Sequence, residues 1–269
     1  MSTEIIHSFG LQLWHVYLLV IFVGFLQGFI NTMAGAGTTV MFSFLSFFGM
    51  PVNMINGTVR PGILFQTAAS SFKYYKKNKL ALRKGLVLGI PMIIGSVFGA
   101  EVAISIDGNV FEKIVAVFLL ILMFPMFYNP KKWLEGQSVE RQSKTGVLQL
   151  LIFTFIGFYG GFLHIGVGII LLVALVLNVG YDLVQANALK VFLVLMYAPI
   201  VLIIFLINGQ VDLLVALFVT IGNIVGGIVG ANVVIKKGSK FVRMFLVVII
   251  IVFSFHLLGV WKWAYQLVF

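Results

Sequence analysis

The stretch NTMAGAGTT, residues 31–39, interrupts a long apolar run near the start of the chain. Of the 269 residues, 61% are hydrophobic and 10% charged, whereas soluble domains carry about 25% charged residues. This composition excludes a water-soluble domain and predicts an all-α polytopic membrane protein. A Gly-rich interruption in such a chain predicts a discontinuous helix buried within the protein, because lipid offers no partner to the freed peptide groups.

A second break, HIGVG at residues 164–168, has the same character. Around the two breaks the hydropathy pattern predicts ten apolar segments, most of them long enough to cross ~30 Å of hydrocarbon. The segment after each break is short, at about 14 residues, which predicts a short broken helix. The predicted segments are 12–31, 37–49, 55–72, 84–103, 110–128, 146–163, 166–179, 184–207, 211–234 and 241–259.

The two breaks belong to an internal duplication. Gly35-Ala36-Gly37 matches Gly166-Val167-Gly168, and further matching pairs share the same interval of 131 residues. A constant interval indicates a repeat rather than chance glycine matches. We expect one transmembrane domain over 1–269, with repeat one at about 12–128, a cytoplasmic linker at 129–145 and repeat two at 146–259. The further pairs are Asn56 with Asn187, Gly95 with Gly226, and Gly99-Ala100 with Gly230-Ala231.

The charge distribution predicts how the repeats are oriented. The chain has 18 Lys and Arg against 8 Asp and Glu, and 14 of the cations lie in the loops 73–84, 129–145 and 236–243. In a membrane protein such loops mark the cytoplasmic side, so the excess does not indicate nucleic acid. All three are cytoplasmic only if the repeats, of about five segments each, are inverted. Inverted repeats with broken helices are typical of secondary transporters, which predicts a multi-pass protein of the cell (inner) membrane bilayer.

Two cations lie inside apolar segments, at equivalent places in the repeats. Arg60 and Lys190 fall within one position of each other in the alignment. A charge inside a span is costly and usually faces the bundle interior, so this pair predicts an attractive field for one anion near the midplane. The alternative is that both side chains snorkel outward or brace the loop before their own helix.

The breaks themselves are the second candidate feature. A helix that starts near Thr38, after Gly35 and Gly37, directs its free N–H groups and positive dipole end at an anion. Gly166 and Gly168 repeat this pattern. The alternative is close helix packing through small residues, which is the interpretation we favour for the GxxxG pairs Gly95/Gly99 and Gly226/Gly230.

Polar side chains flank both features. Asn31 and His164 precede the two breaks, where either can donate to an oxyanion and His164 can carry a coupled proton; a structural role is the alternative for a lone His. Asn56 and Asn187 precede the two cations and either cap those helices or contact substrate. Gln66 and Tyr197, again 131 residues apart, are weaker candidates.

Motifs for other chemistry are missing from the sequence. The chain has no cysteine, no Walker A motif and no HExxH motif, which argues against intrinsic ATP hydrolysis and intramembrane metalloproteolysis. We therefore expect no enzyme activity and no cofactor. A coupled proton or sodium ion is the remaining candidate partner beside a small anionic substrate.

Two longer stretches resemble one known family. GFINTMAGAGTTVMFSFLSFFGMPVNMINGTVR at 28–60 and GFYGGFLHIGVGIILLVALVLNVGYDLVQANALKV at 157–191 are similar to the two signatures of the sulfite exporter TauE/SafE (TSUP) family. The resemblance runs from about Leu18 to Leu258. The sequence departs from the family pattern at Ala36, Ser43 and Val59. The motif residues that carry over are Gly35, Gly37, Asn56, Gly57, Thr58 and Arg60, then Gly166, Gly168, Asn187 and Lys190.

This resemblance implies a permease for sulfite, sulfonates or other small organic anions. With the residues above, it leads us to expect an anion bound between the two breaks and carried by alternating access. The alternatives are an importer of another anion, such as a carboxylate, and a membrane scaffold that transports nothing. We expect the substrate to contact Asn31, Gly35, Gly37, Thr38, Asn56, Arg60, His164, Gly166, Gly168, Asn187 and Lys190.

Overall fold

The computed structural model describes residues 12–106 and 145–257, and this part of the chain is helical throughout, without strands. The predicted segment 110–128 and residues 129–144 of the predicted linker lie outside the described residues. The elements are α2 (Leu13–Met33), α3 (Thr38–Phe47), α4 (Val52–Thr58), α5 (Arg60–Lys76), α6 (Leu82–Ser105), α10 (Val147–Phe162), α11 (Val167–Val173), the π-helical turn η2 (Ala174–Val179), α12 (Leu183–Ile207) and α13 (Leu213–Leu257).

The helix lengths agree with a membrane protein. Four stretches of the described chain are long and apolar enough to cross a bilayer, and the two helices that follow the breaks are short, as predicted. Large apolar side chains on the outer helices face outward, among them Phe98, Phe155 and Leu213, which suits a surface covered by lipid. The protein is therefore an all-α polytopic membrane protein. The four stretches are Leu13–Met33, Leu82–Ser105, Leu183–Ile207 and Leu213–Val242.

One predicted segment was wrong. The single segment predicted at 55–72 is divided into α4 and α5, so Arg60 lies at the first residue of α5 rather than several residues inside a span. Pro61 follows it at the first turn, where a missing N–H costs no hydrogen bond. The break predicted between the segments 211–234 and 241–259 is present: α13 consists of two helical stretches separated at Gly238, whose backbone is not helical (φ 73°, ψ −177°).

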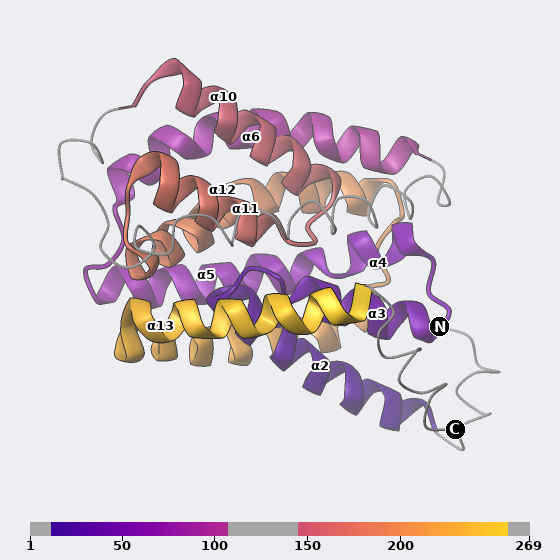
Figure 1. Ribbon diagram of the computed structural model, residues 1–269. Coiled ribbons are helices and arrows are strands. Elements are labelled where there is room, and N and C mark those ends of the chain that lie inside the picture. Colours follow the sequence, from indigo (N-terminus) through magenta and orange to yellow (C-terminus); the bar gives the residue numbers. More distant parts are fainter. Residues whose placement is uncertain (1–11, 107–144, 258–269) are drawn as a thin grey trace.

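The helices pack in three layers (Figure 1). Helices α6 and α10 lie together along one face, α2 and α13 along the opposite face, and α5 and α12 lie between them. Glycines bring both outer pairs close: a side chain on Gly95 or Gly99 would overlap α10, and one on Gly226 would overlap α2. The interpretation of these GxxxG pairs as packing sites is therefore confirmed.

Left-handed backbone recurs at the interval of the sequence repeat. Gly35 (φ 81°) and Gly166 (φ 70°) are 131 residues apart, and so are Gly49 (φ 74°) and Gly180 (φ 95°). Asn78 (φ 53°), the only non-glycine residue of this kind in the described chain, is matched by Gly209 (φ 67°) at the same interval. Only glycine and, less readily, asparagine enter this region at low cost. The turns of the two halves thus share one backbone geometry.

Candidate substrate site

The two Gly-rich breaks meet at the centre of the protein. Gly35 and Gly168 pack backbone to backbone, so a side chain on either would overlap the other residue. A side chain on Gly37 would likewise overlap the carbonyl of Gln27 in α2. Close packing alone therefore explains glycine at these three positions. These glycines can contribute to ligand binding only by letting the neighbouring polar groups approach closely.

A small cavity lies beside this crossing. Both breaks contribute to its wall, together with α5 and α12, so predicted candidates from the two halves meet here. Its volume of about 20 Å³ is room for about one water molecule. The lining residues are Asn31, Gly35, Gln66, Thr67, His164, Val167, Gly168, Lys190, Val191 and Val194.

Lys190 reaches from α12 to the end of a helix in the other half. Its Nζ donates to the carbonyl oxygens of Asn31 and Thr32 at the end of α2, both at 2.9 Å, and to Asn187 Oδ1 at 2.6 Å. The Asn31 carbonyl also accepts from the Gly35 N–H at 2.9 Å, directly after the end of α2. The three ammonium protons are thus all donated to the protein in this conformation.

Arg60 makes the equivalent contact in the opposite direction. From the start of α5, its Nη1 donates to the Gly160 carbonyl at 2.7 Å and its Nη2 to the Gly161 carbonyl at 2.8 Å, at the end of α10. The guanidinium also lies over the Phe205 ring, 5.0 Å from its centre. Each cation thus binds the broken end of the other half's first helix. Neither side chain snorkels outward, since both are buried. Arg60 also braces the segment before its own helix, because its Nε donates to the Asn56 carbonyl at 3.2 Å.

The two asparagines before the cations orient them. Asn56 Oδ1 accepts from Arg60 Nη2 at 3.0 Å, and Asn56 Nδ2 donates to the Phe162 carbonyl at 2.9 Å. Asn187 takes the same place beside Lys190. Neither caps the helix of its cation: the cap of α12 is Asp182, whose Oδ1 accepts from the first-turn N–H groups. The helix-cap alternative was therefore wrong.

Asn31 and His164 both line the cavity and are both buried. Asn31 Oδ1 accepts from the backbone N–H of Thr38 at 3.2 Å, and its Nδ2 donates to Thr38 Oγ1 at 3.0 Å. Asn31 therefore binds the first residue of α3, which begins where the sequence predicted. His164 Nδ1 lies 3.1 Å from the Tyr197 hydroxyl, so a structural partner accounts for this histidine.

The site holds positive charge without a balancing acid. Within residues 12–106 and 145–257, neither Arg60 nor Lys190 forms an ion pair, although both are buried. Buried charges are usually paired. The end of an α-helix offers each cation only about half an elementary negative charge. The helix end stabilises each cation but brings no net charge, so each cation keeps its formal charge without a counter-ion in the described chain, which favours an anion nearby.

The predicted site residues divide into two groups. Asn31, Gly35, His164, Gly168 and Lys190 line the cavity. The others lie behind it: Thr38, Asn56, Arg60 and Asn187 through the contacts above, Gly37 against α2, and Gly166 as the left-handed residue before α11. Gly57 and Thr58 of the family motif contact the turn after α12, where Thr58 Oγ1 accepts from the Asp212 N–H at 3.0 Å.

Sequence reasoning underrated the α5 wall of the cavity. Thr67 was not a candidate and Gln66 only a weak one. The signal for Gln66 was its place opposite Tyr197 in the repeat. Two apolar residues, Val191 and Val194, complete the wall, and nothing in the sequence distinguishes them from other valines of α12.

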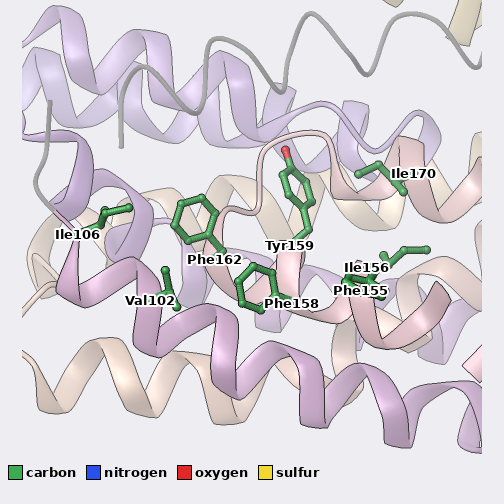
Figure 2. Close-up of a pocket in the computed structure, with 8 residues that line it drawn as sticks. All are labelled: Val102, Ile106, Phe155, Ile156, Phe158, Tyr159, Phe162 and Ile170. Atoms are coloured by element: carbon green, nitrogen blue, oxygen red, sulfur yellow. The ribbon is translucent and has the colours of Figure 1, made fainter. Parts of the chain in front are cut away.

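A larger pocket elsewhere has the wrong chemistry for an anion. It lies between α6, α10 and α11, has a volume of about 610 Å³ and is lined almost wholly by apolar side chains. Figure 2 shows the Phe158 and Phe162 rings beside Val102 and Ile106. The one lining hydroxyl, that of Tyr159, donates to the Ile165 carbonyl at 2.6 Å. This pocket suits hydrocarbon, and the small cavity is the candidate site.

The comparisons with known proteins indicate a membrane transporter. Residues 20–257 match the family described as Sulfite exporter TauE/SafE, and the chain belongs to this family. A probable membrane transporter protein of Haemophilus influenzae is 28% identical over 84% of this chain and 88% of its own length. One from a Sinorhizobium species is 26% identical over 91% and 94%, and YfcA of Escherichia coli, of the same description, is 25% identical over 89% and 88%. No solved structure shows a significant match.

Proposed function

We propose that the protein is a secondary transporter of a small anion, and that the anion is sulfite or an organosulfonate-type sulfur compound. The observation that carries the proposal is the pair of buried cations, without carboxylate partners in the described chain, at the crossing of two broken helices. Their uncompensated charge favours an anion and disfavours a cation at the same place. The family description supports the sulfur chemistry.

In this proposal the anion occupies the small cavity after it widens. Lys190 supplies charge from the cavity wall, with Asn31 and His164 as hydrogen-bond donors. Arg60 does not line the cavity and acts by holding the end of α10. Gly35, Gly37, Thr38, Gly166 and Gly168 shape the two breaks, and Asn56 and Asn187 orient the cations.

Alternating access follows from the repeats. We propose that residues 12–128 and 146–259 act as inverted halves that rock about the crossing of Gly35 and Gly168 in the inner membrane. Because Arg60 and Lys190 each bind the other half, such rocking changes the contacts of both cations. An anion that binds them better in one state than in the other then shifts the equilibrium between states.

The test is flux into liposomes that contain the purified protein. Uptake of radiolabelled sulfite, methanesulfonate and acetate is measured with an imposed proton gradient, an imposed sodium gradient, or neither; protein-free liposomes are the control. The proposal expects saturable uptake of a sulfur oxyanion above acetate. Preferential uptake of acetate identifies the carboxylate importer instead, and no protein-dependent uptake of any anion supports the scaffold alternative.

A further inference from the structure

One face of α5 carries a row of buried polar side chains. The row starts at the cavity with Gln66 and Thr67 and continues through Ser70 and Ser71 to Tyr74. Residues four and eight positions apart share one face of a helix, and eight residues span about 12 Å. The row therefore leads from the candidate site to the end of α5, where the basic loop 73–84 begins.

Three atoms of this row have no hydrogen-bond partner among residues 12–106 and 145–257: Gln66 Oε1, Ser71 Oγ and the Tyr74 hydroxyl. All three side chains are at least nine-tenths buried. Gln66 Nε2 donates to Thr32 Oγ1 at 2.7 Å, on a residue that does not line the cavity. Gln66 Oε1 is thus the atom of this amide left to accept a hydrogen bond from water or from a protonated oxyanion. Buried polar atoms without partners are rare and commonly mark a place where water or a ligand enters.

The other half has no such row. The residues 131 positions later, on α12, are Tyr197, Ala198, Val201, Leu202 and Phe205. The Tyr197 hydroxyl is paired with His164, and the ring of Phe205 packs against Arg60. Beyond Tyr197 this face is apolar: Ala198, Val201 and Phe205 are buried and Leu202 is half-buried, so the face offers no hydrogen bond to a hydrated ion.

The two rows lead away from the cavity toward opposite ends of the protein. The turn after α12 contacts the start of α5, since the Asp212 N–H donates to Thr58 Oγ1. The early part of α12 lies instead near the loop after α5, where a side chain on Gly85 would meet Leu189 and Phe192. Helices α5 and α12 therefore run in opposite directions.

We propose that the polar face of α5, from Gln66 to Tyr74, is the route by which the anion moves between the cavity and the face that carries the basic loop. The matching apolar face of α12 is the seal toward the opposite side. Hydroxyl and amide groups form hydrogen bonds with a partly dehydrated anion. They bind it more weakly than a fixed charge does, so the anion can move along the row. This inference rests on the proposed function and assigns the route to one named helix face.

The absence of cysteine from the sequence makes the route directly testable by single substitutions. Ser71→Cys replaces one oxygen by sulfur on the polar row. Leu202→Cys is the matched control at the equivalent place on α12, and Phe72→Cys is a neighbour that faces outward. Each variant is reconstituted, sorted by orientation, and treated with a membrane-impermeant, negatively charged methanethiosulfonate reagent from one face at a time.

The cysteine thiolate attacks the sulfenyl sulfur of the reagent, which forms a mixed disulfide and releases methanesulfinate. The thiolate forms only where water reaches the sulfur, so Ser71→Cys is expected to react at least about tenfold faster than either control. The reaction should occur from the face of the basic loop. Equal rates for Ser71→Cys and Leu202→Cys, or reaction from the opposite face alone, overturn the route. Anion flux is measured separately on the unsubstituted chain. Labelling without flux supports the route for water and contradicts the proposed function, whereas flux without labelling contradicts the route alone.

Discussion

The ammonium group of Lys190 lies 2.9 Å from the carbonyl oxygen of Asn31, which is 159 residues away in the sequence. The reverse contact joins Arg60 to the Gly160 carbonyl at 2.7 Å. Each half of the chain thus supplies the cation that closes the broken helix of the other half. Because helix-end carbonyls need partners when water is excluded, the two halves cannot separate without exposing these groups.

Arg60→Lys should lower the melting temperature although the charge is kept. A lysine cannot reproduce the planar set of contacts to Gly160, Gly161 and Asn56. The loss of one charge-assisted hydrogen bond costs about 1.5–3 kcal/mol. Thermal unfolding in detergent measures the effect, with Arg83→Lys on the exposed start of α6 as the control. Equal melting temperatures for the two variants would show that guanidinium geometry does not matter here.

Gly168→Ala should separate the two breaks. The added methyl group overlaps the backbone of Gly35, and overpacking of this kind costs about 1–3 kcal/mol. Gly146→Ala is the control, because a side chain there meets nothing within 4 Å. We expect a lower melting temperature and reduced flux for Gly168→Ala alone. A Gly168→Ala protein as stable and active as the control contradicts the close crossing.

Tyr74→Phe should stabilise the fold while it slows transport. The variant removes a buried hydroxyl that has no partner in the described chain, and such a group costs about 1–3 kcal/mol when it is buried. Tyr75→Phe, on the exposed side of α5, is the matched control. Melting temperature and anion flux are measured on both variants. Unchanged flux for Tyr74→Phe argues against a role for this hydroxyl on the anion's route.

Much of the fold could be predicted from residue patterns. The apolar runs indicated the long helices, and the 131-residue interval of glycine and asparagine pairs reappears in the left-handed turns at Gly35 and Gly166. Such features are local, since chain length and backbone conformation decide them. The division of the predicted segment 55–72 at Val59 was missed, although Pro61 follows it directly and proline is favoured in the first turn of a helix.

The sequence identified the residues of the candidate site but not the contacts that they make. Arg60 and Lys190 were identified because charges are rare in apolar segments. Their partners are backbone carbonyls of the other half, and a carbonyl has no sequence signature. The contribution of Thr67 to the cavity wall likewise depends on how α5 packs.

A small anion should raise the melting temperature of the purified protein. A ligand that binds only the folded state stabilises it by about 2.7 kcal/mol at one hundred times its Kd. We expect sulfite or methanesulfonate to shift unfolding at constant ionic strength, while the exchange of choline chloride for sodium chloride does not. A shift with sodium alone identifies a cation site and contradicts the charge argument for Arg60 and Lys190.

The most direct test of an anion held beside Lys190 is equilibrium binding of radiolabelled sulfite to the purified protein. Lys190→Met keeps the length of the side chain and removes its charge, and Lys77→Gln removes a charge from the exposed loop after α5. Retention of a single monodisperse species on gel filtration shows that each variant is folded. We expect Lys190→Met to bind at least about tenfold more weakly, a difference of 1.4 kcal/mol, and Lys77→Gln to bind as the unsubstituted protein does. Equal sulfite affinity for all three proteins would contradict the site.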